Sequence, residues 1–274
     1  MRSRCCSVRF INRLWRTGPV ARLDIEVRRA ETAIRAWFPA LDAPVTSREQ
    51  TVVVGLGLRG IALYRGLIHA CSGPTPTIAA EADLRALVDL VILIRWIEMA
   101  PALHIDMWLA EDDRGRITLG EKWGEMHRRR GSSAGPAFTS EEVATMREGL
   151  AKVRAAARTA GEHVGEKGAM MPSIEHMAAA TDDLFEAYQI AYRSLSPSSH
   201  SGARSFVRDT AEQRADGWHL KPSAAWEPLH LRALGVPLMC FLVASVSRQL
   251  SLNLETRADQ FRVEFTKWRM QDAQ

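Results

Sequence analysis

Two side chains with the chemistry to act on a phosphate ester lie seven residues apart in the sequence, Arg193 and His200. An arginine binds a phosphate through two parallel N–H donors, and a histidine exchanges protons near neutral pH. Together they form a workable pair for cleaving RNA, with the ribose 2′-hydroxyl as the nucleophile. In that reaction His200 would be the general acid or base, and Arg193 would stabilise the developing negative charge.

A predicted helix ending near Leu195 positions this pair. Its polar stripe consists of Asp182, Glu186, Gln189 and Arg193. Pro197 disfavours helix at the residue before it, so His200 can turn back towards the helix end, with Glu186 as a supporting residue. A structural interpretation stays open, in which Arg193 pairs with Glu186 or Asp182 and His200 caps the helix.

A glycine motif follows the apolar run that begins at Thr51. It consists of Gly55, Gly57 and Gly60, with Glu81 further along. This spacing is typical of dinucleotide sites, where glycines let the backbone approach a pyrophosphate between a strand and a helix. A capping box of Thr46 and Glu49 predicts a helix where that strand is needed. We therefore favour a helix whose glycines allow close packing, and we disfavour a Rossmann enzyme.

The segment from 78 to 99 is apolar on nearly every side, which predicts a buried central helix. Its charges are spaced for pairing, Arg85 with Asp89 and Arg95 with Glu98. Buried charges are costly unless they are paired. These four residues therefore either stabilise the core or line a pocket within it.

The remaining candidate groups support neither a metal site nor a covalent mechanism. His104 and Asp106 share an H-x-D spacing, but the sequence places no third ligand beside them. The sequence also lacks a G-x-S-x-G motif and a Cys/His signature. We expect no metal and no cofactor.

Composition limits the class of protein. The 274 residues are 46% apolar and 25% charged, which is typical of a globular domain, and the net charge of +4 is mild. The four cysteines have neither disulfide nor zinc spacing, which favours a cytoplasmic setting. The apolar stretch 236–246 is too short to cross a bilayer, so we expect no membrane span.

Helical periodicity dominates the chain, and no run alternates convincingly with period two. The predicted helices cover residues 20–37, 46–71, 78–99, 139–164, 181–195, 234–252 and 257–268, with a short helix from 172. Residues 112–138, rich in glycine and charge, are expected to form a long exposed loop that includes the basic run 127–130. We predict an all-α fold with an N-terminal extension at 1–44, carrying one amphipathic helix, and a helical bundle at 45–274.

Two segments resemble a known family. Arg85-Ala-Leu-Val-Asp89 follows a helix that contains L-Y-R-G-L, and Tyr188-x-x-x-Tyr192-Arg193-x-Leu195-Ser196-x-x-x-His200 follows about a hundred residues later. Over roughly Thr46 to Leu252, this pattern is similar to the bacterial family called domain of unknown function 5677. The resemblance implies a helical bundle and no settled activity.

The spacing of Arg193 and His200 also resembles the R-x(4–6)-H motif of HEPN ribonucleases. That resemblance implies metal-independent RNA cleavage by a homodimer in a toxin–antitoxin or phage-defence system, with RNA and a cognate antitoxin as partners. The chain departs from the motif at Ser194, where a polar Asn, Asp or His is common, and at the interrupting Pro197. The alternative is a non-catalytic helical module that binds a protein or a ligand.

Overall fold

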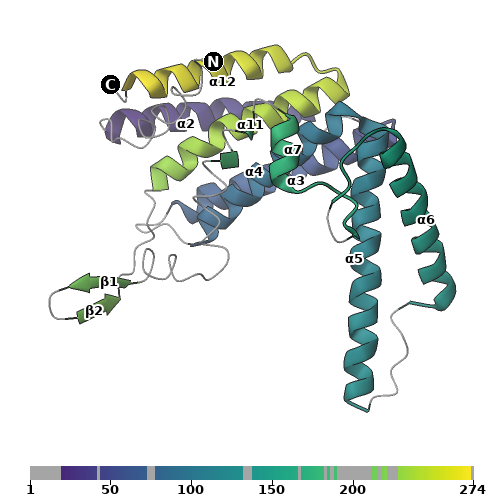
Figure 1. Ribbon diagram of the computed structural model, residues 1–274. Coiled ribbons are helices and arrows are strands. Elements are labelled where there is room, and N and C mark those ends of the chain that lie inside the picture. The colour runs from purple at the N-terminus through teal and green to yellow at the C-terminus, as the bar shows by residue number, and fades with distance from the viewer. Residues whose placement is uncertain are drawn as a thin grey trace, which may run out of the picture. The chain divides into compact units, whose positions relative to one another are not determined.

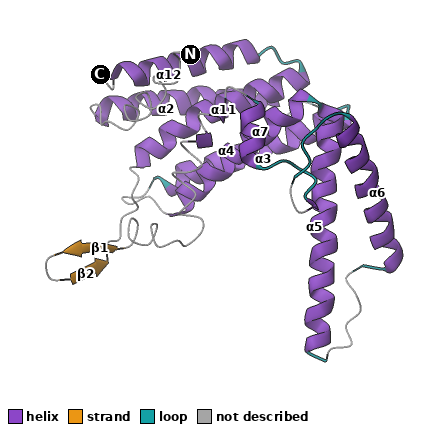
Figure 2. Ribbon diagram, viewed as in Figure 1, coloured by secondary structure: helices purple, strands orange, loops and turns teal. Residues whose placement is uncertain are grey.

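The computed structural model describes residues 20–41, 44–72, 78–131, 138–165, 168–181, 184–185, 188–189, 211–214, 217–220 and 228–272. The described residues are mainly helical, so the predicted all-α class is confirmed, and Figure 2 shows one small pair of strands in addition to the helices.

The elements are labelled in chain order in Figure 1. They are α2 (Val20–Trp37), the 3-10 helix η1 (Phe38–Leu41), α3 (Arg48–Ala70), α4 (Ile78–Met99), α5 (Pro101–Arg129), α6 (Ser140–Thr159), α7 (Ile174–Ala180), β1 (Ala211–Arg214), β2 (Gly217–Leu220), α11 (Pro228–Leu250) and α12 (Glu255–Asp272). They belong to two compact units. Unit 1 comprises Met1–Arg95 and Thr181–Gln274, and unit 2 comprises Trp96–Ala180, so the division falls within α4.

Helix α11 is the centre of unit 1, because it is apolar on all sides. A helix of this kind is stable in water only when neighbouring elements cover it. Helices α2, α3 and α12 pack against it, and Figure 1 shows α2 and α12 running beside it. From α2 the predicted stripe is buried, with Val27, Ala30, Ile34 and Trp37 in the core.

Helix α11 begins at Pro228, earlier than the predicted start at residue 234. A proline fits the first turn of a helix, where no backbone N–H donor is needed. The added turn carries Arg232, whose Nε and Nη2 donate to the two carboxylate oxygens of Glu31 on α2, at 2.8 and 2.7 Å. The added turn therefore joins α11 to α2. The helical period of the sequence does not predict this contact.

The glycine motif lies inside α3, as the helical interpretation predicts, rather than between a strand and a helix. A Cβ at Gly57 would lie 2.5 Å from Val246 Cγ2, and a Cβ at Gly60 would overlap Leu242 and approach Leu90 Cδ2 to 3.1 Å. A Cβ at Gly55 would meet nothing within 4 Å. Two of the three glycines therefore allow close packing of α3 on its neighbours.

The N-terminus of α3 is capped one residue later than predicted. The Ser47 hydroxyl accepts from the Gln50 backbone N–H at 3.1 Å, and Gln50 Oε1 accepts from the Thr46 N–H at 2.7 Å. The expected pair of Thr46 and Glu49 is therefore wrong. Two overlapping candidates for the cap share this segment, and local sequence alone does not choose between them.

Unit 2 is built on α5 and α6, two long helices that pack side by side (Figure 1). The predicted loop at 112–138 is wrong over most of its length, because α5 continues to Arg129. Ion pairs one turn apart support this part of the helix. They join Arg114 to Glu111, Arg116 to Asp113 and Arg129 to Glu125. Packing against α6 supplies the stabilisation that the glycine-rich sequence lacks.

Helix α6 begins as predicted and ends earlier than predicted. Thr139 and Glu142 form a reciprocal capping box, with the Thr139 N–H donating to Glu142 Oε2 at 2.7 Å. The helix ends at Thr159 rather than near 164, because Gly161 adopts a left-handed conformation with φ of 73°. The predicted helix at 181–195 lies largely outside the described residues, although Leu184 and Tyr188 are buried.

The strands β1 and β2 form an antiparallel hairpin, which pairs Ala211 with Leu220 and Arg214 with Gly217. The sequence analysis predicted no strand here. Each strand has four residues, which is too short for an alternating pattern to stand out.

Two of the described helices, α3 and α11, are long and apolar enough to cross a membrane by length and composition alone. Most of the apolar window of α11 is buried inside the protein. A central core helix has the same composition, so the finding by itself does not assign a location.

The glycine motif supplies a test of the close packing in unit 1. Gly60→Ala should destabilise the protein by about 1–3 kcal/mol, because the new methyl group enters space held by the buried side chains of Leu242 and Leu90. Urea unfolding followed by circular dichroism measures the change.

Gly55→Ala is the matched control, because it lies in the same helix with open space around it. It should stabilise the protein by up to about 1 kcal/mol through helix propensity. Equal effects of the two substitutions would contradict the packing role of Gly60.

Candidate functional site

The three residues of the predicted catalytic stripe, Arg193, His200 and Glu186, lie outside the described residues. The four charged residues of the predicted buried pairs are described, and all belong to α4. Each of the four is partly buried, as the apolar composition of this helix predicts.

The geometry of a helix separates these four residues into two groups. Arg85 and Asp89 are one turn apart and share a face of α4. Arg95 and Glu98 lie further along the helix, on a different side. Arg85, Arg95 and Glu98 each have an interaction partner. The four side chains therefore do not form one cluster along α4.

Asp89 is the member of this set with altered acid–base behaviour. Burial raises the pKa of Asp89 to about 6, and the positive charge of Arg85 opposes this rise. The Oδ1 atom of Asp89 is buried and has no hydrogen-bond partner among the described residues. A carboxyl that titrates near pH 6 can exchange a proton under physiological conditions, which makes Asp89 a candidate functional group in unit 1.

Other polar groups of unit 1 are committed to structure. Arg232 is held by Glu31 and lies 3.7 Å from a carboxylate oxygen of Asp24. The hydroxyl of Ser247 donates to Glu255 and accepts from the Leu254 backbone N–H, both at 2.8 Å, so it fixes the start of α12. These contacts hold Arg232 and Ser247 within the fold, whereas the raised pKa of Asp89 makes that residue a candidate for chemistry.

In unit 2, His104 is almost fully buried and stacks on Trp96, with ring centroids 3.8 Å apart. Its Nδ1 lies 2.6 Å from the Trp96 carbonyl oxygen, which can only accept, so Nδ1 carries a hydrogen. Its Nε2 lies 3.2 Å from Glu162 Oε1. Because the ring is closed to solvent, this cluster suits a structural role, in which it joins α4, α5 and the residues after α6.

The sequence did not predict the contact of His104 with Glu162, because the two residues are far apart in the chain. It singled out His104 with Asp106 as a weak metal motif. Within the part of the chain that the structure describes, no three potential metal ligands come together. The sequence also missed a hollow between α5 and α6, because it predicted a loop where α5 continues. A helical spacing of Ile117, Gly120 and Gly124 is the signal that could have indicated it.

Comparison with known families gives one finding. A model of a family of unknown function, DUF5677, matches residues 50–217, more than half of the chain. The matched range contains both segments that carry the predicted resemblance to this family, which is confirmed. The resemblance to HEPN ribonucleases is not part of this match and stays a prediction. No curated protein and no solved structure matches the chain.

Asp89 makes the stability of the protein depend on pH. Its pKa is near 3.8 in the unfolded chain and about 6 in the folded protein, so the folded state binds more protons between these values. Stability should therefore fall as the pH rises from below about 4 to above about 6, by about 3 kcal/mol from this group at 1.36 kcal/mol per pKa unit.

Asp89→Asn removes the titrating group and should abolish this component of the pH dependence. Urea unfolding of both proteins at several pH values between 4 and 8 measures it. The variant should gain stability relative to the native protein as the pH rises through this window. A constant difference between the two proteins across the window would contradict the raised pKa.

Proposed function

We propose that this chain, which belongs to the family of unknown function DUF5677, is a metal-independent ribonuclease. The observation that carries the proposal is the spacing of Arg193 and His200 in the sequence, inside the matched residues 50–217. An arginine and a histidine are the two side-chain types that RNA cleavage without a metal needs, one for the charge and one for the proton.

In the proposed reaction, the ribose 2′-oxygen attacks the adjacent phosphorus and the bond from phosphorus to the 5′-oxygen breaks. The products are a 2′,3′-cyclic phosphate and a free 5′-hydroxyl. His200 accepts the proton of the 2′-hydroxyl while a water molecule supplies one to the leaving 5′-oxygen, or His200 supplies that proton while water accepts the first. Arg193 binds the phosphate oxygens, whose negative charge increases in the transition state. Glu186 is proposed as a supporting residue.

The described residues are compatible with a site for a charged substrate in unit 1. Helix α4 carries a partly buried cation and a titrating acid, Arg85 and Asp89, in that unit. Tyr188 is buried in the same unit and precedes Arg193 by five residues in the sequence. Polar groups of both signs inside an otherwise apolar unit are costly, and a functional site is one reason for them.

The proposal extends to the setting of the enzyme. HEPN ribonucleases, which the spacing of Arg193 and His200 resembles, bring two such motifs together in a dimer. We therefore propose a homodimer in the cytoplasm, held inactive by a cognate antitoxin or released in phage defence. The cysteine pattern supports the cytoplasmic part of this proposal.

The test is cleavage of labelled RNA by the full chain in excess EDTA. His200→Ala should reduce the rate at least about 100-fold, since it removes the proton-transferring group, and should leave the melting temperature unchanged. His69→Ala is the matched control, because His69 is an exposed histidine in the last turn of α3. The control should cleave at the native rate and should give the same products with cyclic phosphate ends.

The competing hypothesis is a non-catalytic module, in which Arg193 only stabilises the bundle. It predicts a loss of several kcal/mol in Arg193→Ala, because a buried acid would lose its partner. Equal inactivity of the native chain and the His200 variant on several RNAs, together with that loss of stability, would overturn the ribonuclease. A purified native chain that cleaves only with added metal would also overturn it.

A further inference from the structure

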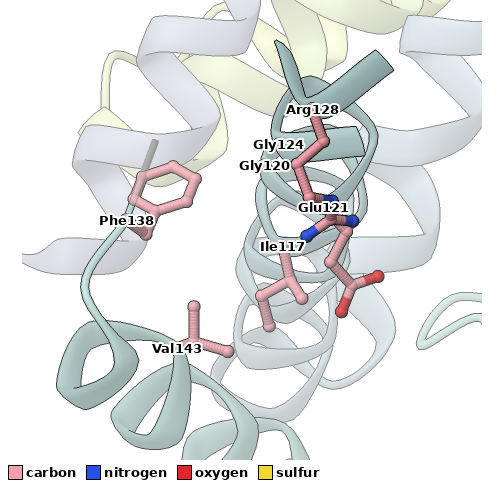
Figure 3. A pocket seen from close by; sticks show the side chains of 7 residues that line it. All are labelled: Ile117, Gly120, Glu121, Gly124, Arg128, Phe138 and Val143. Atoms are coloured by element: carbon pink, nitrogen blue, oxygen red, sulfur yellow. The ribbon is translucent and has the colours of Figure 1, made fainter. Parts of the chain in front are cut away.

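A hollow of about 230 Å³ lies between α5 and α6 in unit 2 (Figure 3). Its walls are formed by residues of both helices and by Phe138, which comes shortly before α6. They are Ile117, Gly120, Glu121, Gly124, Arg128, Phe138 and Val143. Figure 3 shows Phe138 and Val143 on one side and the α5 residues opposite. The volume is below that of typical pockets for drug-sized molecules, so any ligand must be small.

The floor of the hollow is made by two glycines in the interior of α5. A Cβ at Gly124 would meet nothing within 4 Å among the described residues, so no packing contact with them requires glycine at that position. Glycine is also the poorest helix former after proline. Their presence lowers the stability of α5 and keeps the space open.

The charged side chains around the hollow differ in whether they have a described partner. Glu121 is neutralised by Arg147 of α6, at 3.0 Å, and the guanidinium of Arg116 lies 5.3 Å from the centre of the Phe138 ring. In the part of the chain that the structure describes, Arg128 has no ion pair. Figure 3 shows its side chain extending back along α5 past Gly124 towards Ile117. Among the described residues, the hollow thus has mainly apolar walls and, at Arg128, an exposed cation that forms no ion pair.

We propose that this hollow binds a small, flat hydrocarbon group that carries one negative charge, such as an aromatic carboxylate. The hydrocarbon would fill the space above Gly120 and Gly124, and the carboxylate would pair with Arg128. The walls offer few polar atoms to the edges of a nucleobase, so a hydrocarbon ring fits better. This proposal does not depend on the ribonuclease proposal.

The test measures binding of indole-3-acetate and of its uncharged analogue indole-3-acetamide to the full chain by equilibrium dialysis. The acetate should bind more tightly than the acetamide. Gly120→Ala and Gly124→Ala should weaken acetate binding by at least about tenfold, because each methyl group occupies the hollow. Gly124→Ala should also raise the melting temperature, because its Cβ would meet nothing within 4 Å among the described residues, and this result separates lost binding from lost folding.

Gly115→Ala is the matched control, because it lies in the same helix with open space and outside the hollow. It should also raise the melting temperature but leave binding unchanged. The Arg128→Gln variant should still bind indole-3-acetamide with native affinity. It should no longer bind indole-3-acetate more tightly than indole-3-acetamide. Native binding by both hollow-filling variants, or an unchanged preference in Arg128→Gln, would overturn the proposal.

Two kinds of ligand combine an aromatic ring with a carboxylate in this way. One is a free aromatic acid, and the other is a tryptophan beside an aspartate in a partner peptide. A blocked Asp-Trp-Asp tripeptide provides the second arm of the experiment. Tighter binding of the tripeptide than of indole-3-acetate would assign a peptide source, and the reverse would assign a free acid. Failure of both to bind at millimolar concentration would overturn the proposal.

Discussion

The burial of α11 is the constraint on which unit 1 depends. This helix has no polar face to turn towards water, so it must be enclosed by other helices. The enclosure requires close approach, which glycine provides on both sides of the contact with α3. Gly60 of α3 makes room for Leu242, and Gly235 of α11 faces the ring of Tyr64, whose Cε2 would be 2.8 Å from an added Cβ. The packing of unit 1 therefore depends on the complementary shapes of the helix surfaces at least as much as on their hydrophobicity.

Charges inside such a unit follow two different patterns. Arg232 and Glu31 are joined by two parallel hydrogen bonds, so each compensates the other for the loss of water. Asp89 has no such arrangement. Its buried oxygen Oδ1 has no hydrogen-bond partner in the part of the chain that the structure describes, and its proton is retained to a higher pH. The first pattern stabilises the fold, whereas the second is a cost that a functional role would explain. This contrast connects the packing of the unit with the position of its candidate chemistry.

Unit 2 obtains its stability in a different way. Much of α5 is exposed and rich in charge, and its ion pairs lie within one turn of the helix. Such pairs contribute a few tenths of a kcal/mol each, so the helix also needs its contact with α6. At the far end of this pair of helices, the glycines of α5 leave space instead of filling it. The same residue type thus has opposite roles in the two units, allowing contact at Gly60 and leaving space in the hollow at Gly124.

The sequence by itself determined the helical class, the buried stripe of α2, the capping box at Thr139 and the family, because each depends on spacing within one segment or on a short motif. It also separated the glycine motif from a nucleotide site, since a neighbouring cap already indicated a helix. Only the tertiary structure decided that α5 continues through residues 112–129, because a polar, glycine-rich helix is marginal until α6 covers one face. The partners of Arg232 and His104, the raised pKa of Asp89 and the hollow beside Arg128 were likewise decided by folding. These features result from contacts between side chains that are distant in the chain, or from burial. Local spacing in the sequence encodes neither the contacts nor the burial.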